Sequence, residues 1–185
     1  MDIREEILKA TIQAFREKGI KFTMDDLAKI LGMSKKTIYT VFSDKMELLC
    51  AMVDYVFDEI KETEQRVIAE MKGDTLSQIK AVLSALPEGY KDIDFGQLHS
   101  LKDKYPLVYK HVETRLESGW ENTIELLEKG MDEGVIRKVN IPIVKMIMEA
   151  SLEQFFQRDI LEKNSISYQD GLEQVVEIII KGIVA

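Results

Sequence analysis

The sequence predicts an all-α protein in which an N-terminal three-helix helix-turn-helix domain precedes a C-terminal helical domain, with about nine helices in total. Apolar residues recur at helical spacing along nearly the whole chain, and no run alternates between apolar and polar residues as a half-buried strand would. Near the N-terminus, two short helical patterns flank a turn that contains glycine. From the order of these patterns we expect residues 1–46 to form the first domain and residues 47–185 the second.

The first helix is expected to begin near residue 3 and to end at Gly19, which can adopt the left-handed conformation that stops a helix. Its apolar face consists of Ile3, Ile7, Leu8, Thr11, Ala14 and Phe15. A second helix is expected over 24–31, because Thr23 is a good N-cap and Asp26 stands three residues later, as in an acidic variant of the capping box.

A turn and two further helices follow. Gly32 can take a positive φ, and Ser34 can cap a short helix over 35–42. Ser43 or Asp44 then caps a much longer helix. The apolar stripe of this long helix comprises Met46, Leu49, Val53, Val56, Phe57, Ile60, Val67 and Met71.

The rest of the chain also has helical periodicity. The expected helices are 75–86, 95–102, one continuous helix from Pro106 through Met131, and two that begin near Ile141 and Tyr168. Proline suits the first turn of a helix, which explains the start at Pro106, and Gly134 ends that helix.

The composition favours an ordinary globular protein in a reducing compartment. The 185 residues carry a formal net charge of -8, and the single Cys50 cannot form an intramolecular disulfide. No segment is long and apolar enough to span a membrane, and the N-terminus lacks the basic and apolar regions of a secretory signal. We therefore expect a cytoplasmic protein.

No residue pattern indicates an enzyme. The sequence shows no Ser/His/Asp grouping, phosphate-cradling glycine loop, HExxH motif or paired cysteines, so we expect neither catalysis nor a cofactor. Its two histidines, His99 and His111, are not at a local metal-ligand spacing, and we expect no metal site.

The helix-turn-helix pattern indicates DNA binding, because the second helix of such a motif enters the major groove. Here that helix presents polar side chains that can contact bases or phosphates, whereas Ile38 and Phe42 are expected to face inward. The polar residues are Lys35, Lys36, Thr37, Tyr39 and Thr40. The first fifty residues carry nine basic and eight acidic side chains, against sixteen basic and twenty-five acidic ones in the remainder.

Residues 19–49 resemble the N-terminal domain of the TetR (tetracycline repressor) family. They match without a gap the pattern G-x-x-x-T-x-x-D-L-A-x-x-x-G-M-S-K-K-T-I-Y-x-x-F-x-x-K-x-x-L-L. Residues 130–137 are similar to the segment that precedes the last two helices of the family. The resemblance implies a homodimer whose N-terminal domains bind a palindromic DNA operator and whose C-terminal domains bind a small effector.

The resemblance also implies which residues contact DNA. The expected contacts are Thr23, Ser34, Lys35, Lys36, Thr37, Tyr39, Thr40 and Lys45. Tyr39 is expected to meet a phosphate, and Lys45 is expected to contact a phosphate at the start of the long helix. Lys36 stands where relatives often have glycine or another small residue, so it reaches either a base edge or a phosphate.

In the family, the middle helices surround a pocket for a small molecule. The candidate lining residues are Tyr55, Val56, Phe95, Leu98, His99, Tyr105, Tyr109, Val112, Leu116, Trp120 and Phe155. Such a lining suits an apolar ligand that is oriented by one or two hydrogen bonds. Because the C-terminal region is acidic, a lipophilic cation neutralised by a buried Glu or Asp is an alternative ligand.

The last two helices are expected to form the dimer interface, because the first of them is apolar on two faces and must be covered on both. The expected interface residues are Ile143, Ile147, Leu152, Phe155, Leu172, Val175, Val176, Ile179, Ile180 and Ile183. The family resemblance implies the same, since its last two helices form a four-helix bundle across the dimer axis.

The function predicted from the sequence is that of a ligand-responsive transcriptional repressor. A homodimer would bind a palindromic operator and would be released by a small hydrophobic inducer. An activator, or a DNA-binding structural factor without a ligand, could use the same dimer. A protein-interaction module whose N-terminal helices bind a partner other than DNA is a further alternative.

Overall fold

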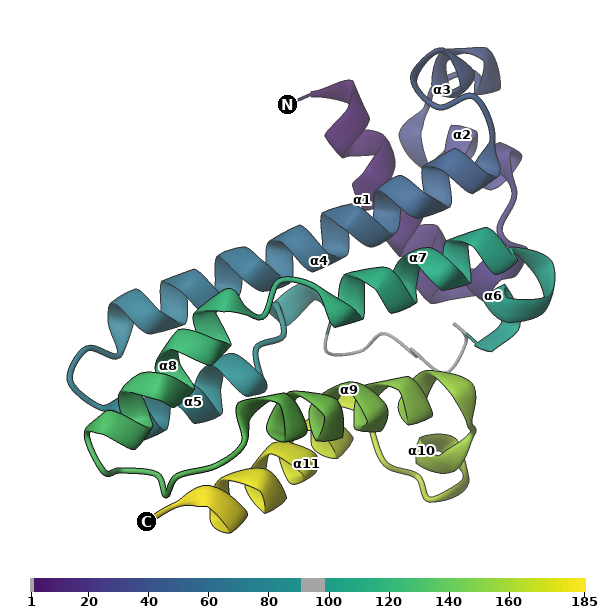
Figure 1. Ribbon diagram of the computed structural model, residues 1–185. Coiled ribbons are helices and arrows are strands. Elements are labelled where there is room, and N and C mark those ends of the chain that lie inside the picture. Colours follow the sequence, from purple (N-terminus) through teal and green to yellow (C-terminus); the bar gives the residue numbers. More distant parts are fainter. Residues whose placement is uncertain (1, 91–98) are drawn as a thin grey trace. The chain divides into compact units, whose positions relative to one another are not determined.

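The computed structural model, which describes residues 2–90 and 99–185, is built from helices (Figure 1). Over those residues there is no strand, and the single β-type contact is an isolated antiparallel bridge between Ile136 and Val184. The all-α prediction is therefore confirmed. The described residues form two compact units: residues 2–57 and 99–114 make up the first, and 58–90 and 115–185 the second.

The first unit contains the predicted helix-turn-helix. Its elements are α1 (Ile3–Lys18), the short 3-10 helix η1 (Gly19–Lys21), α2 (Met24–Leu31), α3 (Lys35–Val41), the first part of α4 (Lys45–Glu70), α6 (His99–Lys104) and most of α7 (Pro106–Glu117). Its fully buried side chains include Ile7, Phe22, Leu27, Ile38, Phe42, Leu48 and Leu49. These side chains come from every helix from α1 to α4, so each of the short helices α2 and α3 is fixed by a shared core.

Side-chain caps mark the starts of these helices. The Thr23 and Ser34 side chains accept hydrogen bonds from the third residues of α2 and α3, as predicted. At the start of α4, Asp44 accepts the N–H of Glu47, and the Glu47 carboxylate in turn accepts the N–H of Ser43. Ser43 and Asp44 therefore both take part in capping α4.

The second unit contains the remaining helices. They are the rest of α4, α5 (Thr75–Leu83), the 3-10 helix η2 (Glu88–Tyr90), α8 (Glu121–Asp132), α9 (Ile141–Gln157), the short α10 (Ile160–Lys163) and α11 (Tyr168–Ile183). Helix α5 packs against α8 and α11, and α9 packs against α11 (Figure 1). The buried core between them consists of Ile79, Val82, Leu83, Leu126, Leu127, Ile136, Val144, Met148, Leu172, Val176, Ile179 and Ile183.

The prediction of a single long helix from Pro106 through Met131 is wrong. The chain leaves the helix at Ser118, and Gly119 adopts a φ of +74°, so that α7 and α8 are separate helices. A side chain at position 119 would also meet the Lys61 stem, whose Cε lies 2.8 Å from the ideal Cβ position. No sequence signal marked this break, because the apolar residues on both sides of it keep a helical spacing.

Three smaller differences concern helix ends. Helix α5 ends at Leu83 rather than at residue 86, and α10 was not expected from the sequence. The helix expected over 95–102 begins, among the described residues, at His99 and continues to Lys104.

No helix in the part of the chain that is described is both long and apolar enough to cross a membrane.

The turn between α2 and α3 requires a left-handed residue at Gly32, whose φ is +63°. Met33 N–H donates to the Ala28 carbonyl at 3.1 Å and Gly32 N–H to the Lys29 carbonyl at 3.4 Å, which is the hydrogen-bond pattern of a Schellman motif. No atom lies within 4 Å of a Cβ built at Gly32, so space does not limit this position.

We therefore expect Gly32→Ala to destabilise the protein by about 1–2 kcal/mol through backbone strain alone. Gly32→Asn is the matched control and should cost less, because asparagine tolerates the left-handed region better. Urea unfolding of the two variants measures the difference. An alanine variant as stable as the wild type would show that the turn does not impose this conformation.

Candidate nucleic-acid interface

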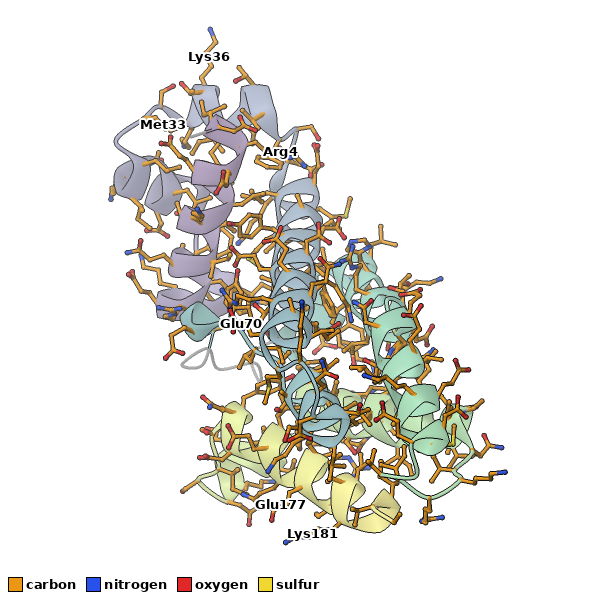
Figure 2. All side chains as sticks on the ribbon, turned by 90° about the vertical axis from the view of Figure 1, so that its left-hand side faces the viewer. Arg4, Met33, Lys36, Glu70, Glu177 and Lys181 are labelled. Atoms are coloured by element: carbon orange, nitrogen blue, oxygen red, sulfur yellow. The ribbon has the colours of Figure 1, made fainter. Side chains whose placement is uncertain are left out.

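Helix α3 presents a polar face to solvent while its opposite face is held in the core. Ile38 is completely buried, whereas Lys36, Tyr39 and Thr40 are exposed. Figure 2 shows Lys36 pointing away from the rest of the chain at the end of the helix-turn-helix. Neither Lys36 nor Tyr39 has a hydrogen-bond partner among residues 2–90 and 99–185, so both side chains are available to a ligand.

Other polar groups of α3 are engaged within the helix. The Ser34 hydroxyl accepts the Thr37 N–H at 3.1 Å and lies 2.9 Å from the Thr37 hydroxyl. The Thr40 hydroxyl donates to the Thr37 carbonyl at 2.6 Å. These contacts cap the helix and fix its first turn, and hydroxyl oxygens keep a further lone pair for a partner.

Lys35 forms an exposed ion pair with Asp25 of α2, with 3.0 Å between the ammonium nitrogen and a carboxylate oxygen. The pair joins the first turns of the two helices of the motif. An exposed pair of this kind is worth only about 0.2–1 kcal/mol, so a base or a phosphate can displace Asp25. The ten-residue separation of Asp25 and Lys35 gave no sequence signal for this contact.

The start of α2 is capped more extensively than predicted. The Asp26 carboxylate accepts the Thr23 N–H at 2.8 Å and the Thr23 hydroxyl at 2.9 Å. Lys18 of α1 donates to the same carboxylate at 2.5 Å. Both donors of Thr23 are therefore already used, and the predicted contact of Thr23 with a phosphate would require Asp26 to release one of them.

Lys45 has a different environment from the one predicted. Its ammonium donates to the Ile20 carbonyl at 2.8 Å and to the Phe22 carbonyl, and it lies 4.0 Å from the centre of the Phe22 ring. Partial burial, together with the nearby positive charge of Lys104, lowers the pKa of Lys45. The structure thus turns this ammonium toward the protein rather than toward solvent.

Arg4 is a basic residue that the sequence pattern did not single out. Its guanidinium stacks over the ring of Phe42, at the end of α3, at 4.5 Å from the ring centre. Because this contact joins α1 to the end of α3, local spacing could not have identified it.

Residues 7–52, which contain this motif, match the family model described as "Bacterial regulatory proteins, tetR family". The HTH-type transcriptional regulator YvaF of Bacillus subtilis is 28% identical over 181 residues, covering 98% of this chain and 95% of that protein. The N-terminal domain belongs to the TetR family. The chain is similar to a DNA-binding transcriptional regulator of this type over nearly its whole length, as the sequence predicted.

Two further relatives extend this result. A TetR transcription regulator from Haloarcula marismortui, known from its crystal structure, has a TM-score of 0.73 at 19% identity, with 98% of both chains covered. The nucleoid occlusion factor SlmA of Vibrio atlanticus is 25% identical over 169 residues, covering 84% of this chain and 85% of that protein. The TetR fold therefore extends over both units of the chain.

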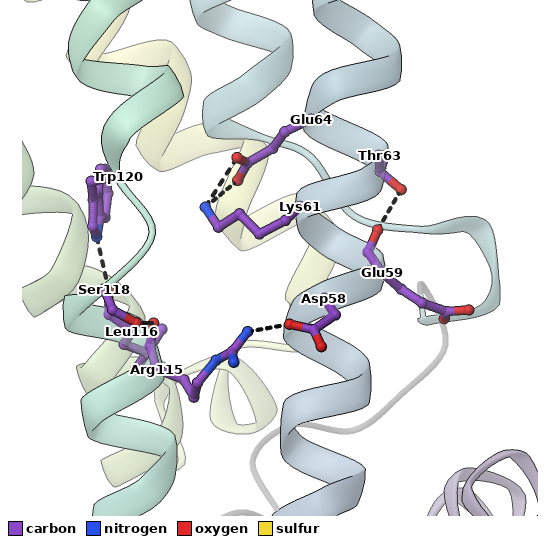
Figure 3. Close-up of polar contacts among 9 residues, drawn as sticks. All are labelled: Asp58, Glu59, Lys61, Thr63, Glu64, Arg115, Leu116, Ser118 and Trp120. Carbon is purple, nitrogen blue, oxygen red and sulfur yellow. Dashed lines mark hydrogen bonds and ion pairs between the residues drawn. The ribbon is translucent and has the colours of Figure 1, made fainter. Parts of the chain in front are cut away.

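In the second unit of the chain, polar side chains meet where α4 faces the break between α7 and α8 (Figure 3). Arg115 donates to Asp58 at 2.6 Å, and the Trp120 indole N–H donates to the Leu116 carbonyl at 2.8 Å. Glu64 is only 5% exposed, and burial raises its pKa. Of the acidic residues described, Glu64 is the one that is buried, and Lys61 contacts both of its carboxylate oxygens at 2.8 and 3.0 Å.

The predicted ligand-binding residues divide between the two units. Tyr55, Val56, Tyr105, Tyr109 and Val112 lie in the first, and Leu116, Trp120 and Phe155 lie in the second. Phe95 and Leu98 are outside the described residues, as is the side chain of His99. Tyr109 and Val112 are buried, whereas the other six described residues of the set are partly exposed. That they line one pocket stays a prediction.

The residues predicted for the dimer interface also separate into two groups. Leu172, Val176, Ile179 and Ile183 are buried in the core of the chain itself, and Leu152, Val175 and Ile180 pack against that core. Phe155 contacts Tyr168 edge to face, with 6.0 Å between the ring centres. Of the ten predicted residues, only Ile143 and Ile147 are exposed, at 49% and 44%, and the unpredicted Met146 and Ile178 are exposed as well, Ile178 at 72%.

The cap of α2 should make this motif sensitive to acid. Hydrogen bonds from Lys18 and Thr23 hold the pKa of Asp26 well below its usual range. Because the unfolded chain then binds more protons than the folded one below pH 4 or so, the stabilisation by Asp26 is complete above that pH and is lost as the pH falls.

We expect Asp26→Asn to lower the melting temperature at neutral pH, where the carboxylate is charged. The difference between the variant and the wild type should shrink as the pH is lowered below about 4. Thermal unfolding monitored by circular dichroism over a pH series measures it. A difference that stays constant with pH would contradict the role of the charged carboxylate.

Proposed function

We propose that this TetR-family regulator is a ligand-responsive transcriptional repressor that binds a palindromic operator as a homodimer and is released by a small hydrophobic inducer. The observation that carries the proposal is the exposed polar face of α3, where Lys36 and Tyr39 point to solvent while Ile38 fixes the helix in the core. Such a helix, braced by α2, suits insertion into the major groove. Because a regulator of transcription acts where the chromosome is, we propose that the protein is cytoplasmic.

The dimer is supported by an uncovered apolar surface on α9 and α11. Ile143, Met146 and Ile147 of α9 and Ile178 of α11 are all exposed, on two helices that pack against each other. We call these four residues the α9–α11 patch. A second copy of the chain is its natural occupant, because one helix-turn-helix domain offers too little surface for tight specific binding and dimers match palindromic sites.

The inducer is proposed to be apolar rather than cationic. Partly exposed aromatic side chains in the predicted lining, such as Tyr55 and Trp120, suit a hydrophobic molecule with one or two polar groups. A cationic ligand would need an unneutralised buried acid, but Glu64, the buried acid among the described residues, is already paired with Lys61. The long helix α4 carries residues of both units, so an inducer that displaces it would change the spacing of the two α3 helices.

The chief rival is a DNA-binding factor without an inducer, for which the nucleoid occlusion factor SlmA among the relatives gives a specific reason. An activator would use the same dimer and the same DNA contacts. Both alternatives predict DNA binding through α3, but the factor without a ligand predicts no release of DNA by any hydrophobic compound.

The DNA-binding role of α3 can be tested with Lys36→Ala. Loss of one good base contact costs roughly 1–3 kcal/mol, which corresponds to about a 5- to 150-fold weaker complex. Loss of a phosphate contact instead weakens binding to all sequences and flattens the salt dependence by about one unit. Fluorescence anisotropy with labelled duplexes measures both effects.

Lys163→Ala is the matched control for this experiment, because Lys163 lies on α10 of the second unit and pairs only with its neighbour Asp159 among the described residues. We expect it to bind DNA like the wild type. Unchanged DNA affinity in Lys36→Ala would contradict the proposal that α3 is the helix that enters the groove.

The α9–α11 patch can be tested with Ile178→Glu. A charge buried without a partner in the interface should raise the dimer dissociation constant on the order of 100-fold or more. Ile160→Glu is the control, because Ile160 is an exposed isoleucine on α10, outside the patch. Sedimentation equilibrium gives the masses, and a wild-type monomer at micromolar concentration would refute the dimer.

A further inference from the structure

The two adjacent lysines of α3 have different surroundings. Lys35 is tied to the first turn of α2 by its ion pair with Asp25, with 3.0 Å between the ammonium nitrogen and a carboxylate oxygen. Lys36 has no hydrogen bond or ion pair with any residue in the ranges 2–90 and 99–185, and it points away from the rest of the chain (Figure 2). The two neighbours therefore serve different surfaces of the helix-turn-helix.

Helical geometry explains this difference. Consecutive residues project about 100° apart around a helix, whereas residues three or four apart share a face. Lys35 stands three residues before Ile38, which is completely buried, so it lies at the edge of the face that packs into the first unit. Lys36 shares its face with Tyr39 and Thr40, which are both exposed. The exposed face of α3 thus begins with the Lys36 ammonium.

The hydroxyl groups beside Lys36 already take part in contacts within the motif. The Thr40 hydroxyl donates to the Thr37 carbonyl at 2.6 Å, and the Thr37 and Ser34 hydroxyls lie 2.9 Å apart. Lys36 is the second residue of α3, and its ammonium offers hydrogen-bond donors but no acceptor. Residues at the N-terminal end of a recognition helix contact base edges in the major groove. Lys36 therefore brings an unused donor to the end of the helix that meets the bases.

The chemistry of an ammonium distinguishes among the bases. In the major groove, guanine presents two neighbouring acceptors, N7 and O6, whereas adenine presents an amino donor beside its N7 acceptor. Cytosine presents an amino donor, and thymine presents its O4 acceptor beside a methyl group. A group that only donates therefore finds the most partners at guanine.

We propose that Lys36 is a specificity-determining residue, which donates hydrogen bonds to N7 and O6 of a guanine in each half-site of the operator. Lys35 is directed toward α2 and hence toward the DNA backbone, which the first helix of the motif crosses. The sequence alone left Lys36 between a base edge and a phosphate, and the proposal assigns it to a base. The proposal rests on the proposed sequence-specific binding of an operator, but not on a repressor role or an inducer.

Replacing Lys36 by glutamine and by methionine separates the reading of a base from contact with a phosphate. A glutamine amide matches adenine, because its oxygen accepts from N6 and its nitrogen donates to N7. Methionine keeps an unbranched apolar stem but offers no donor. Lys35→Gln is the matched control, because it removes the neighbouring charge of the same helix.

Duplexes bound by the full-length wild type and by each variant are selected from random DNA. The selected half-site is then made with each of the four bases at the guanine position. Fluorescence anisotropy over a range of KCl concentrations gives the affinity of every protein for every duplex.

We expect the wild type to prefer guanine at one position of each half-site by about 5- to 150-fold over the other bases. Lys36→Gln should shift this preference to adenine, and Lys36→Met should bind the four duplexes about equally. The remainder of the selected sequence should be the same in both variants. Lys35→Gln should weaken binding without changing the preferred base.

A wild-type half-site without guanine, or an unchanged guanine preference in both Lys36 variants, would overturn the proposal. So would a Lys36→Met variant whose only change is a salt dependence flattened by about 0.9 per protomer, since Lys36 would then contact a phosphate. A wild type that selects no shared sequence would refute the proposed operator binding itself. The failure of this inference and that of the proposed function are therefore distinguishable.

Discussion

The DNA-binding motif depends on how the N-terminus of α2 is held. Helices of eight and seven residues such as α2 and α3 are not stable alone in water, so their shape must come from caps and from tertiary packing. Packing is supplied by Leu27 and Ile38, which are completely buried. The cap of α2 and the polar contacts that Lys18 of α1 and Lys45 of α4 make with it all involve residues 18–26. This short segment therefore helps to orient the helix-turn-helix and the polar face of α3.

The second unit is governed by a different constraint, because α9 and α11 carry apolar side chains on two faces and the chain's own core buries only one of them. Val144 and Met148 of α9 and Val176 of α11 face the core of the chain, whereas the α9–α11 patch faces solvent. An exposed apolar surface on helices whose other faces are already packed is the mark of an interaction site. The same two helices can therefore complete the fold of one chain and, as proposed, join it to a second.

Much of the fold could be predicted from local sequence because the signals are local. Thr23, Gly32 and Ser34 act within a few residues of themselves, and the helices they delimit lie where the sequence placed them. Periodicity failed at Gly119, where apolar residues on both sides of a break keep the same spacing. Glycine alone does not distinguish a left-handed residue from a helical one, which Gly130 within α8 illustrates.

The site was less predictable, because its contacts join distant residues. The partners of Lys35 and Lys45 lie ten or more residues away, so the sequence identified the charged groups but not what they contact. Likewise, periodicity placed Leu172 and Val176 on an apolar face without showing that the chain's own core covers it. Ile178 lies outside that stripe and was missed, although it is the most exposed of the large apolar residues described.

Selection of bound duplexes from random DNA at physiological salt tests sequence-specific binding by a dimer most directly. We predict recovery of a palindrome whose half-sites are about one helical turn, or roughly 34 Å, apart, because two α3 helices related by a two-fold axis read successive major grooves. Recovery of duplexes with no shared sequence, bound only through salt-sensitive contacts, would contradict it.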